Sequence, residues 1–210
     1  MSPARPLLIL GAGGHARVVV DILRAGSAPL LGLLDRDAKL HNTEVDGVPV
    51  LGGDDVVAKH ASGDVLLVNA LGNVARQGDG GLKARRALFE AFKAKGYTFA
   101  QVISPAAVVS PRATLGEGCH IITRAVVHPG AVIGDNAIVN TGAQVDHDCR
   151  IGAHAHIAPG AVLCGNVTVD EGSHIGAGAV IIENIKVGAG AVVAAGAVIV
   201  KDVAAEATAF

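Results

Sequence analysis

Aliphatic residues recur with a period of six over the second half of the chain. Every sixth residue from Ile103 to Ile199 is Ile, Leu or Val, at seventeen consecutive positions without an insertion. The residue two positions earlier is mostly Ala, Cys or Ser, so each hexad places one small and one large side chain on the same side of the chain. Chance does not produce such a run. It predicts a repeat architecture of short strands joined by glycine-containing corners.

This hexapeptide-repeat pattern resembles that of the left-handed parallel β-helix acyltransferases, whose coils contain three hexads. The resemblance implies a β-helix of about six coils over residues 101–210. Because the repeat is uninterrupted, we expect any catalytic group to come from the coils and not from an inserted loop. A narrow coil has no room for aromatic rings, which explains why only 2% of the chain is aromatic although 50% is hydrophobic.

The first 100 residues have a different pattern, in which short apolar runs alternate with helical periodicity. This alternation predicts a small Rossmann-like α/β domain with a parallel sheet of about three strands. We therefore expect two domains, residues 1–100 and 101–210. The expected strands are Leu7–Leu10, Leu30–Leu34 and Val65–Ala70, and the expected helices are Ala16–Ala25, stopped by Gly26, and Lys83–Lys95, stopped by Gly96.

One column of outward positions in the repeat is apolar. The residue before each repeated aliphatic points away from the core, and positions 18 apart fall on one face. The column on one face is apolar apart from its glutamine and consists of Val108, Val126, Gln144, Val162, Val180 and Val198. An apolar stripe on an outer surface is typical of an interface. Since threefold symmetry is the simplest closure for a three-faced prism, we expect a homotrimer.

Net charge and cysteine content limit the classes of partner and the cellular compartment that we expect. With 17 basic and 19 acidic residues the formal net charge is -2, so we expect neither nucleic acid nor an anionic membrane as a partner. The most apolar stretch, Val187–Val200, is shorter than a membrane span and continues the repeat. The three cysteines, Cys119, Cys149 and Cys164, are odd in number and lack metal-site spacing, which favours a soluble protein of the reducing cytoplasm.

The histidines suggest a metal site only weakly. His156 and His174 lie one coil apart on the same face, and another column contains His128, Asp146 and Cys164. Successive coils are roughly 4.8 Å apart, so such stacks could hold zinc. Stacked polar side chains are common on β-helices without metal, and no supporting hydrogen-bond pattern is visible in the sequence. We therefore expect no metal.

The segment 140–149 contains a candidate general base. His147 is expected at a coil corner and lies between two carboxylates, Asp146 and Asp148. A carboxylate that hydrogen-bonds the imidazole would fix its tautomer and raise its basicity. A solvated corner histidine would have the same spacing. The residues alone leave both interpretations open.

The whole chain resembles the sugar-nucleotide N-acetyltransferases of bacterial glycan pathways, such as the enzymes that acetylate UDP-linked bacillosamine precursors or GDP-perosamine. It is also similar to the sialic acid O-acetyltransferase branch. In the sugar-nucleotide N-acetyltransferases the catalytic core consists of an Asn and of a His seven residues later that has an acidic neighbour. Asn140, His147 and Asp148 match this pattern. The resemblance implies that acetyl-CoA is the co-substrate. The residues that it assigns to acetyl-CoA are His156, Ala177 and Ala195.

A glycine-rich turn in the first domain fits the same family. Gly11, Gly13 and Ala16 form a G-x-G-x-x-A pattern between a strand and a helix, where backbone amides and the helix dipole can bind a diphosphate. Asp35, at the end of the next strand, could bind a ribose or a base. The resemblance implies that the nucleotide-sugar contacts are Gly13, Gly14, His15, Asp35, Arg36 and Gly72.

The implied reaction is direct acetyl transfer to the 4-amino group of a nucleotide-linked 4-amino-4,6-dideoxy sugar, GDP-perosamine or a UDP-4-amino sugar, in O-antigen or lipopolysaccharide biosynthesis. His147 would accept the amine proton, with Asp148 or Asp146 tuning it and corner amides stabilising the oxyanion. His147 and His156 point from different faces of one prism, so we expect active sites between subunits. Two alternatives remain: a sialic acid-type or other sugar O-acetyltransferase with the same base, and a non-catalytic or NAD-binding protein.

Overall fold

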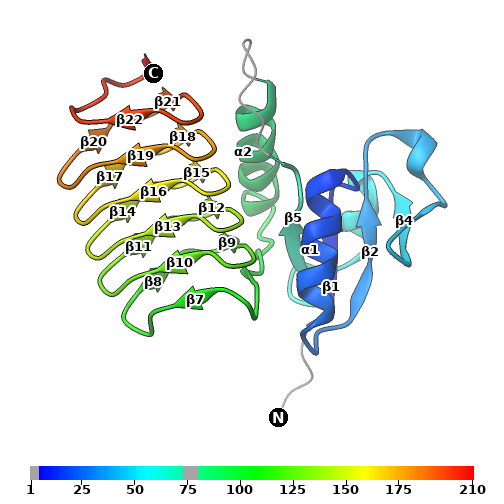
Figure 1. Cartoon of the computed structure of the whole chain (residues 1–210). Helices are drawn as coiled ribbons and strands as arrows, with labels where there is room; N and C mark the ends of the chain where they lie inside the picture. The colour runs from blue at the N-terminus through cyan, green and yellow to red at the C-terminus, as the bar shows by residue number, and fades with distance from the viewer. Residues whose placement is uncertain (1–4, 73–79) are drawn as a thin grey trace.

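The computed structural model describes residues 5–72 and 80–210 and contains an α/β part followed by a left-handed parallel β-helix (Figure 1). The α/β sheet and the stack of coils lie side by side, with helix α2 (Gly80–Lys93) between them. The predicted fold class is therefore confirmed. Among the described residues no helix is long and apolar enough to span a bilayer.

The α/β part is a five-stranded sheet in the order β3-β4-β2-β1-β5. All pairs are parallel except β3 with β4. The three predicted strands correspond to β1, β2 and β5, whereas β3 and β4 were not predicted, because Pro49 interrupts the apolar alternation of β4. The bounds are β1 Leu7–Leu10, α1 Gly14–Arg24, β2 Leu30–Leu34, the 3-10 turn Ala38–Leu40, β3 Glu44–Val45, β4 Val48–Gly52, the 3-10 turn Asp54–Lys59 and β5 Leu66–Asn69.

Helix α1 begins two residues earlier than its apolar periodicity predicts. It starts at Gly14, with Gly13 as the N-terminal cap in an extended conformation. His15 is therefore in the first helical turn and not in the preceding loop. Helix α2 likewise begins and ends nearer the N-terminus than the predicted helix Lys83–Lys95. The chain turns after it at Gly96, whose φ of 84° is in the left-handed region.

The β-helix consists of short parallel strands in three sheets, and from β6 to β22 each strand pairs with strands 18 residues away, whereas β23 pairs with β21 at a spacing of 16. We call the three sheets the β6 face, the β7 face and the β8 face after their first strands. The strands are β6 Val102–Ile103, β7 Val108–Val109, β8 Thr114–Leu115, β9 His120–Ile121, β10 Val126–Val127, β11 Val132–Ile133, β12 Ile138–Val139, β13 Gln144–Val145, β14 Arg150–Ile151, β15 His156–Ile157, β16 Val162–Leu163, β17 Thr168–Val169, β18 His174–Ile175, β19 Val180–Ile181, β20 Lys186–Val187, β21 Val192–Val193, β22 Val198–Ile199 and β23 Thr208–Ala209.

The core of the prism is built from the repeated pairs. The aliphatic positions from Ile121 to Ile199 are buried, and the small residues two positions earlier pack between them. Cys119 and Cys149 occupy two of these small inward positions and are fully buried. Ile103, in the first coil, is 41% exposed because no coil lies below it. The interior is thus a one-residue-thick stack with no space for a deep pocket.

The α/β part covers the lower part of the β6 face. Val102 and Ile138, which point out of the prism, are buried in one cluster with Val19 and Ile22 of α1. This column was expected to be outward-facing, and the structure adds that another domain covers it. Helix α2 is fixed to the corner between the β8 and β6 faces by exposed ion pairs, Arg86–Glu171 at 3.0 Å and Lys93–Glu117 at 2.8 Å.

Candidate active site

A groove of about 480 Å³ runs along the corner between the β6 and β7 faces. Asn140, Ala158, Gly176 and Ala194 follow one another at 18-residue spacing along this corner, so the groove extends over four coils, or roughly 14 Å. Its small side chains leave room for an extended, slender ligand. The lining residues that the family resemblance assigns are Asn140, His156, Ala177 and Ala195.

Asn140 and His156 form a hydrogen-bonded pair in this corner groove. The Nδ2 atom of Asn140 is 3.1 Å from Nε2 of His156, and its Oδ1 accepts a hydrogen bond from the Thr141 amide at 2.8 Å. Because Oδ1 is bound to an N–H group, Nδ2 donates to the imidazole, and the His156 proton is assigned to Nδ1. The pair therefore presents a neutral, oriented imidazole at the groove.

His174 is a groove residue that the sequence analysis considered only as a possible metal ligand. Its ring lies against His156, with the ring centroids 4.9 Å apart and the planes inclined by 71°. Burial lowers the pKa of His174, so this ring is also neutral at neutral pH. The signal in the sequence was the 18-residue spacing from His156, which places both rings on one face.

His147 lies at a different corner, between the β7 and β8 faces. Its Nδ1 is 2.9 Å from Oδ2 of Asp148, and its backbone amide donates to Oδ1 of Asp146 at 2.6 Å. The hydrogen bond to Asp148 raises the pKa of His147, and the nearby charge of Asp146 raises it further. Since the carboxylate accepts from Nδ1, the tautomer leaves Nε2 free of a proton. The His147 side chain is 61% exposed.

The β7 face separates these two groups within one chain. Asn140 and His156 lie at one edge of this face, and His147 and Asp148 lie at the other. The exposed part of the face is the predicted apolar column, in which Val108 is 64% exposed. One subunit alone therefore does not bring His147 to the corner groove.

The glycine turn lies at the carboxyl end of the α/β sheet. Gly13 and Gly14 are exposed, and a Cβ added to either would meet no atom within 4 Å. Asp35 fixes the turn, because its carboxylate accepts hydrogen bonds from the amides of Ala12 at 2.8 Å and Asp37 at 2.9 Å. The turn is thus preorganised and has open space beside it for a ligand.

Arg36 and Gly72 lie around the same sheet edge. Arg36 is exposed and pairs with Asp54 at 2.7 Å. Gly72 is exposed and close to His15, since a Cβ on Gly72 would stand 3.4 Å from the Cβ of His15. The structure therefore brings Gly13, Gly14, His15 and Gly72 together. Asn73, which follows Gly72, lies outside the described residues.

His15 connects this turn to the β-helix. Its Nε2 is 3.1 Å from Nδ1 of His120 on β9, and the two rings stack with centroids 5.3 Å apart. Burial, followed by the charge of Arg85, lowers the pKa of His15 to about 4, and the same causes hold the pKa of His120 well below its usual value. His120 is two coils below His156 on the β6 face, which is roughly 10 Å.

A buried arginine, absent from the sequence hypotheses, holds the junction behind His15. Arg85 of α2 is fully buried and donates to the backbone carbonyl oxygens of Asn69, Leu71 and Asn136. The side chain of Asn69 donates to Oδ1 of Asn136 at 3.1 Å. The guanidinium thereby joins the end of β5, just before Gly72, to a coil corner of the β-helix.

Neither cysteine chemistry nor a metal centre is evident in the described part of the chain. Burial raises the pKa of Cys119 to about 12 and that of Cys149 to about 11, so both thiols are protonated at neutral pH. Within residues 5–72 and 80–210 no group of three or more His, Cys, Asp or Glu side chains is placed to hold a metal ion.

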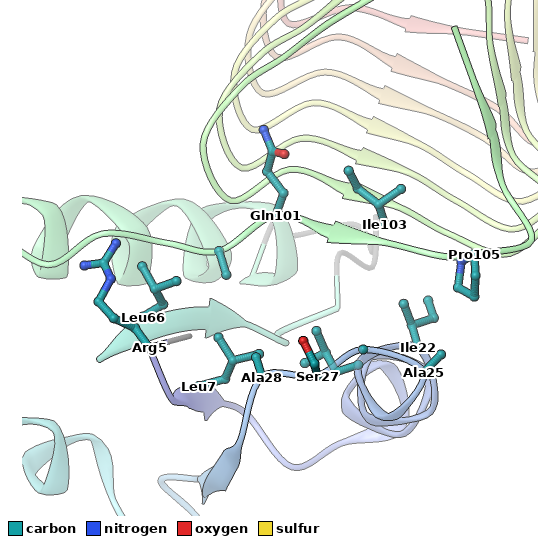
Figure 2. Close-up of a pocket in the computed structure, with 13 residues that line it drawn as sticks. Arg5, Leu7, Ile22, Ala25, Ser27, Ala28, Leu66, Gln101, Ile103 and Pro105 are labelled. Atoms are coloured by element: carbon teal, nitrogen blue, oxygen red, sulfur yellow. The ribbon is translucent and has the colours of Figure 1, made fainter. Parts of the chain in front are cut away.

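Another cavity, of about 570 Å³, lies apart from these residues, between the end of α1, the start of β1 and the first coil (Figure 2). Its lining is mainly apolar and includes Leu7, Ile22 and Ile103, with Arg5 and Gln101 as polar members. It is at the amino edge of the parallel sheet, opposite the glycine turn. It contains none of the predicted site residues.

Two family models match the chain. The model described as the PglD N-terminal domain matches residues 6–77, and the model described as bacterial transferase hexapeptide (six repeats) matches residues 130–165 and 148–182. No curated protein sequence gave a significant match.

Solved structures match over nearly the full length. The acetyltransferase domain of PglB from Neisseria gonorrhoeae, in complex with acetyl coenzyme A, is 37% identical with a TM-score of 0.85, covering 96% of this chain and 93% of that chain. PerB from Caulobacter crescentus, in complex with CoA and GDP-perosamine, is 36% identical with a TM-score of 0.85, covering 95% and 91%. WeeI from Acinetobacter baumannii is 27% identical with a TM-score of 0.77, covering 97% and 95%.

Proposed function

The chain belongs to the hexapeptide-repeat sugar-nucleotide N-acetyltransferases, and within this family we propose that it acetylates the 4-amino group of a nucleotide-linked 4-amino-4,6-dideoxy sugar. The acetyl donor is acetyl-CoA. GDP-perosamine and UDP-4-amino sugars are the proposed acceptors, and the GDP-perosamine complex of the Caulobacter relative supports the first. The observation that carries the proposal is the corner groove, which gathers Asn140, His156, Ala177 and Ala195 along one edge of the coils.

We assign the corner groove to the thioester arm of acetyl-CoA. The arm is long and thin, and the groove is a shallow channel over four coils with alanine and glycine along its floor. The polar side chains of the channel are Asn140, His156 and His174, and the hydrogen bond between Asn140 and His156 fixes both of these side chains. They would orient the arm without carrying charge.

We assign the glycine turn to the diphosphate of the sugar nucleotide. The amides at the start of α1 and the helix dipole favour an anion there, and the space beside Gly13 and Gly14 is open. His15 and Gly72 lie at the same edge. The bound sugar would then extend toward the β6 face, where His120 and His156 are two coils apart.

His147 is the proposed general base. The sugar amine must lose a proton as its nitrogen forms a bond to the thioester carbonyl carbon and the C–S bond breaks. Nε2 of His147 accepts this proton, because Nδ1 is engaged by Asp148. The proton then passes to the thiolate of CoA as the leaving group. Backbone amides at the coil corners would stabilise the negative charge that develops on the carbonyl oxygen.

The site we propose is completed by a second subunit of a homotrimer. The apolar β7 face lies between the corner groove and His147, and it is exposed in the single chain, with Val198 at 60%. Packing these faces around a threefold axis would bury them and place the His147 corner of one subunit against the groove of the next. Because the three cysteines are free, we propose the reducing cytoplasm as the location.

The proposal is tested by measuring release of the CoA thiol with GDP- and UDP-linked 4-amino-4,6-dideoxy sugars. We expect turnover with at least one of them, and a loss of 10²- to 10⁴-fold (roughly, for a general base) in kcat for His147→Ala. The matched control is His128→Ala, which removes another exposed histidine next to a coil corner and should leave kcat unchanged.

Three other outcomes would change the proposed reaction or the proposed base. Turnover only with sugars that offer a hydroxyl group in place of the amine would make the protein an O-acetyltransferase with the same base. No turnover with any sugar nucleotide, together with NAD binding, would contradict the proposed function. Unchanged kcat in His147→Ala would exclude His147 as the base.

A further inference from the structure

The imidazole of His147 occupies the place where a side chain on the next coil would begin. Gly165 is 18 residues after His147 and lies directly above it at the same corner. A Cβ built on Gly165 would stand 2.6 Å from both Cε1 and Nε2 of His147, closer than non-bonded carbon atoms come in folded proteins. The ring therefore lies back over the corner, in space that exists only because residue 165 has no side chain.

The backbone does not require glycine at this position. Each coil corner has two turn residues between its strands. Glycines at the second turn residue, such as Gly142 and Gly160, have φ values in the left-handed region. Gly165 is instead the first turn residue of its corner and has an ordinary φ. At every other first corner position from Pro105 to Ala195 the residue carries a side chain. The repeat thus accepts Cβ atoms there, and the steric reason for a glycine at 165 is the ring of His147.

Two contacts hold an otherwise exposed ring. With 61% of its side chain exposed, His147 is not fixed by burial. One contact is the hydrogen bond from Nδ1 to Asp148 at 2.9 Å, and the other is the surface of Gly165. The two corners cannot separate to relieve crowding, because the amide of Asn166 donates to the carbonyl of His147 at 2.9 Å.

Asp148 has a matching glycine on the coil below. A Cβ on Gly130 would collide with Oδ1 of Asp148. Gly130 differs from Gly165 because its φ of 78° already favours glycine. The His147–Asp148 pair therefore lies between one glycine on the coil above and one on the coil below, and only Gly165 is free of a backbone requirement.

We propose that Gly165 is a positioning residue for His147: by lacking a Cβ, it lets the imidazole lie over its own corner with Nδ1 at Asp148 and Nε2 directed along the prism edge. Any side chain at 165 would force rotation about the His147 side-chain bonds and separate Nδ1 from Asp148. The inference rests on the proposed function insofar as His147 is the base of that reaction.

The test is the variant Gly165→Ala, with the pKa of His147 measured by NMR titration of its imidazole. Asp148 and Asp146 are the charged groups that raise this pKa, and the hydrogen bond to Asp148 is the larger contribution. Loss of that bond should move the pKa of His147 down toward its ordinary value. The resonance is assigned by its absence in His147→Ala. The matched control is Gly63→Ala. Gly63 has an ordinary φ, as Gly165 has, but a Cβ added to it would meet no atom within 4 Å.

A double-mutant cycle measures the same contact through stability. Gly165→Ala should lower the unfolding midpoint in the wild-type background and leave it unchanged, or raise it, in the His147→Ala background, where the ring is gone. In the enzymatic assay kcat should fall more than KM for acetyl-CoA rises, because the added Cβ displaces the ring of His147 and not Asn140 or His156, which are proposed to hold the acetyl-CoA arm.

An unchanged His147 pKa in Gly165→Ala, or the same loss of stability in both backgrounds, would overturn the inference. Neither measurement needs turnover. A lowered His147 pKa in a protein that acetylates no sugar nucleotide would therefore support the contact and contradict the proposed function. Normal turnover in Gly165→Ala with a lowered pKa would show that the orientation of His147 is not needed for the reaction and would overturn the positioning role.

Discussion

Replacing Arg85 by methionine should loosen the attachment of the α/β part to the β-helix. Arg85 is fully buried, and its guanidinium donates to carbonyl oxygens of three segments: Asn69 at the end of β5, Leu71 in the following loop, and Asn136 at a coil corner. Methionine has a similar length and a good helix propensity, so α2 itself should be preserved. The substitution removes the three donated hydrogen bonds and leaves their acceptors in place.

The expected decrease in the free energy of unfolding is the difference between two large contributions. Hydrogen bonds from a charged donor contribute about 1.5–3 kcal/mol each, and three of them are lost. Against this, burial lowers the pKa of Arg85 to about 9, well below the usual value of a guanidinium, which corresponds to roughly 5 kcal/mol of unfavourable free energy that the substitution removes. Buried carbonyl groups left without a donor add a further cost. We expect a net decrease of about 2–4 kcal/mol in the free energy of unfolding.

The measurement is urea unfolding followed by circular dichroism, at one fixed protein concentration because association into the proposed trimer would contribute to stability. The matched control is Arg86→Met. Arg86 is the next residue on α2, its side chain is 41% exposed, and its ion pairs with Glu90 and Glu171 are at the surface. Such pairs contribute less than about 1 kcal/mol. KM for the sugar nucleotide should rise more in Arg85→Met than KM for acetyl-CoA, because Leu71 adjoins Gly72.

Equal unfolding free energies for Arg85→Met and Arg86→Met would refute the reasoning. That result would mean that relief of the buried charge fully offsets the three lost hydrogen bonds. The junction would then be held by the apolar contacts around Val102 and Ile138.

Two further predictions concern the base and the assembly. In Asp148→Asn the acid limb of the pH dependence of kcat/KM should move to lower pH, because the proposed base, His147, would act in its neutral form and loses the carboxylate whose hydrogen bond raises its pKa. A limb that stays in place would exclude Asp148 as the partner of His147. Val180→Glu, which puts a charge into the apolar β7 face, should convert the proposed trimer to monomers in sedimentation velocity and abolish turnover, whereas Lys186→Glu on the neighbouring β8 face should do neither.

The β-helix could be predicted from the sequence almost strand by strand, because each hexad repeats the same local information. Val145 and Leu163 pair with each other at the 18-residue spacing, and the other side chains of their core also belong to the repeat. The corner groove could have been predicted by the same reasoning, since its residues Asn140, Ala158, Gly176 and Ala194 are 18 positions apart. Strand β4 was missed because a strand with Pro49 resembles a loop until its neighbour β2 is placed beside it.

The junction could not be predicted, because it joins two parts with unrelated patterns. Arg85 lies in the predicted helix Lys83–Lys95, and the sequence analysis assigned it no role. One signal was available: Arg85 shares the apolar side of α2 with Leu88, Phe89 and Phe92, all buried, at spacings of three, four and seven. His120 looked like an outward strand residue, and only the docking of α1 buries it against His15.

The 18-residue register has a consequence for how such a chain can change in length. Strands β9 to β19 are paired with residues 18 away on both sides, so within this part of the prism the faces stay aligned only if insertions or deletions in the coils comprise whole coils. Removing a single hexad between His147 and His156 would turn all later coils by one face, and the alanines of the corner groove would be replaced there by residues from another corner. Natural variants should therefore differ in length by complete turns of the prism, and a designer can lengthen the groove by duplicating one.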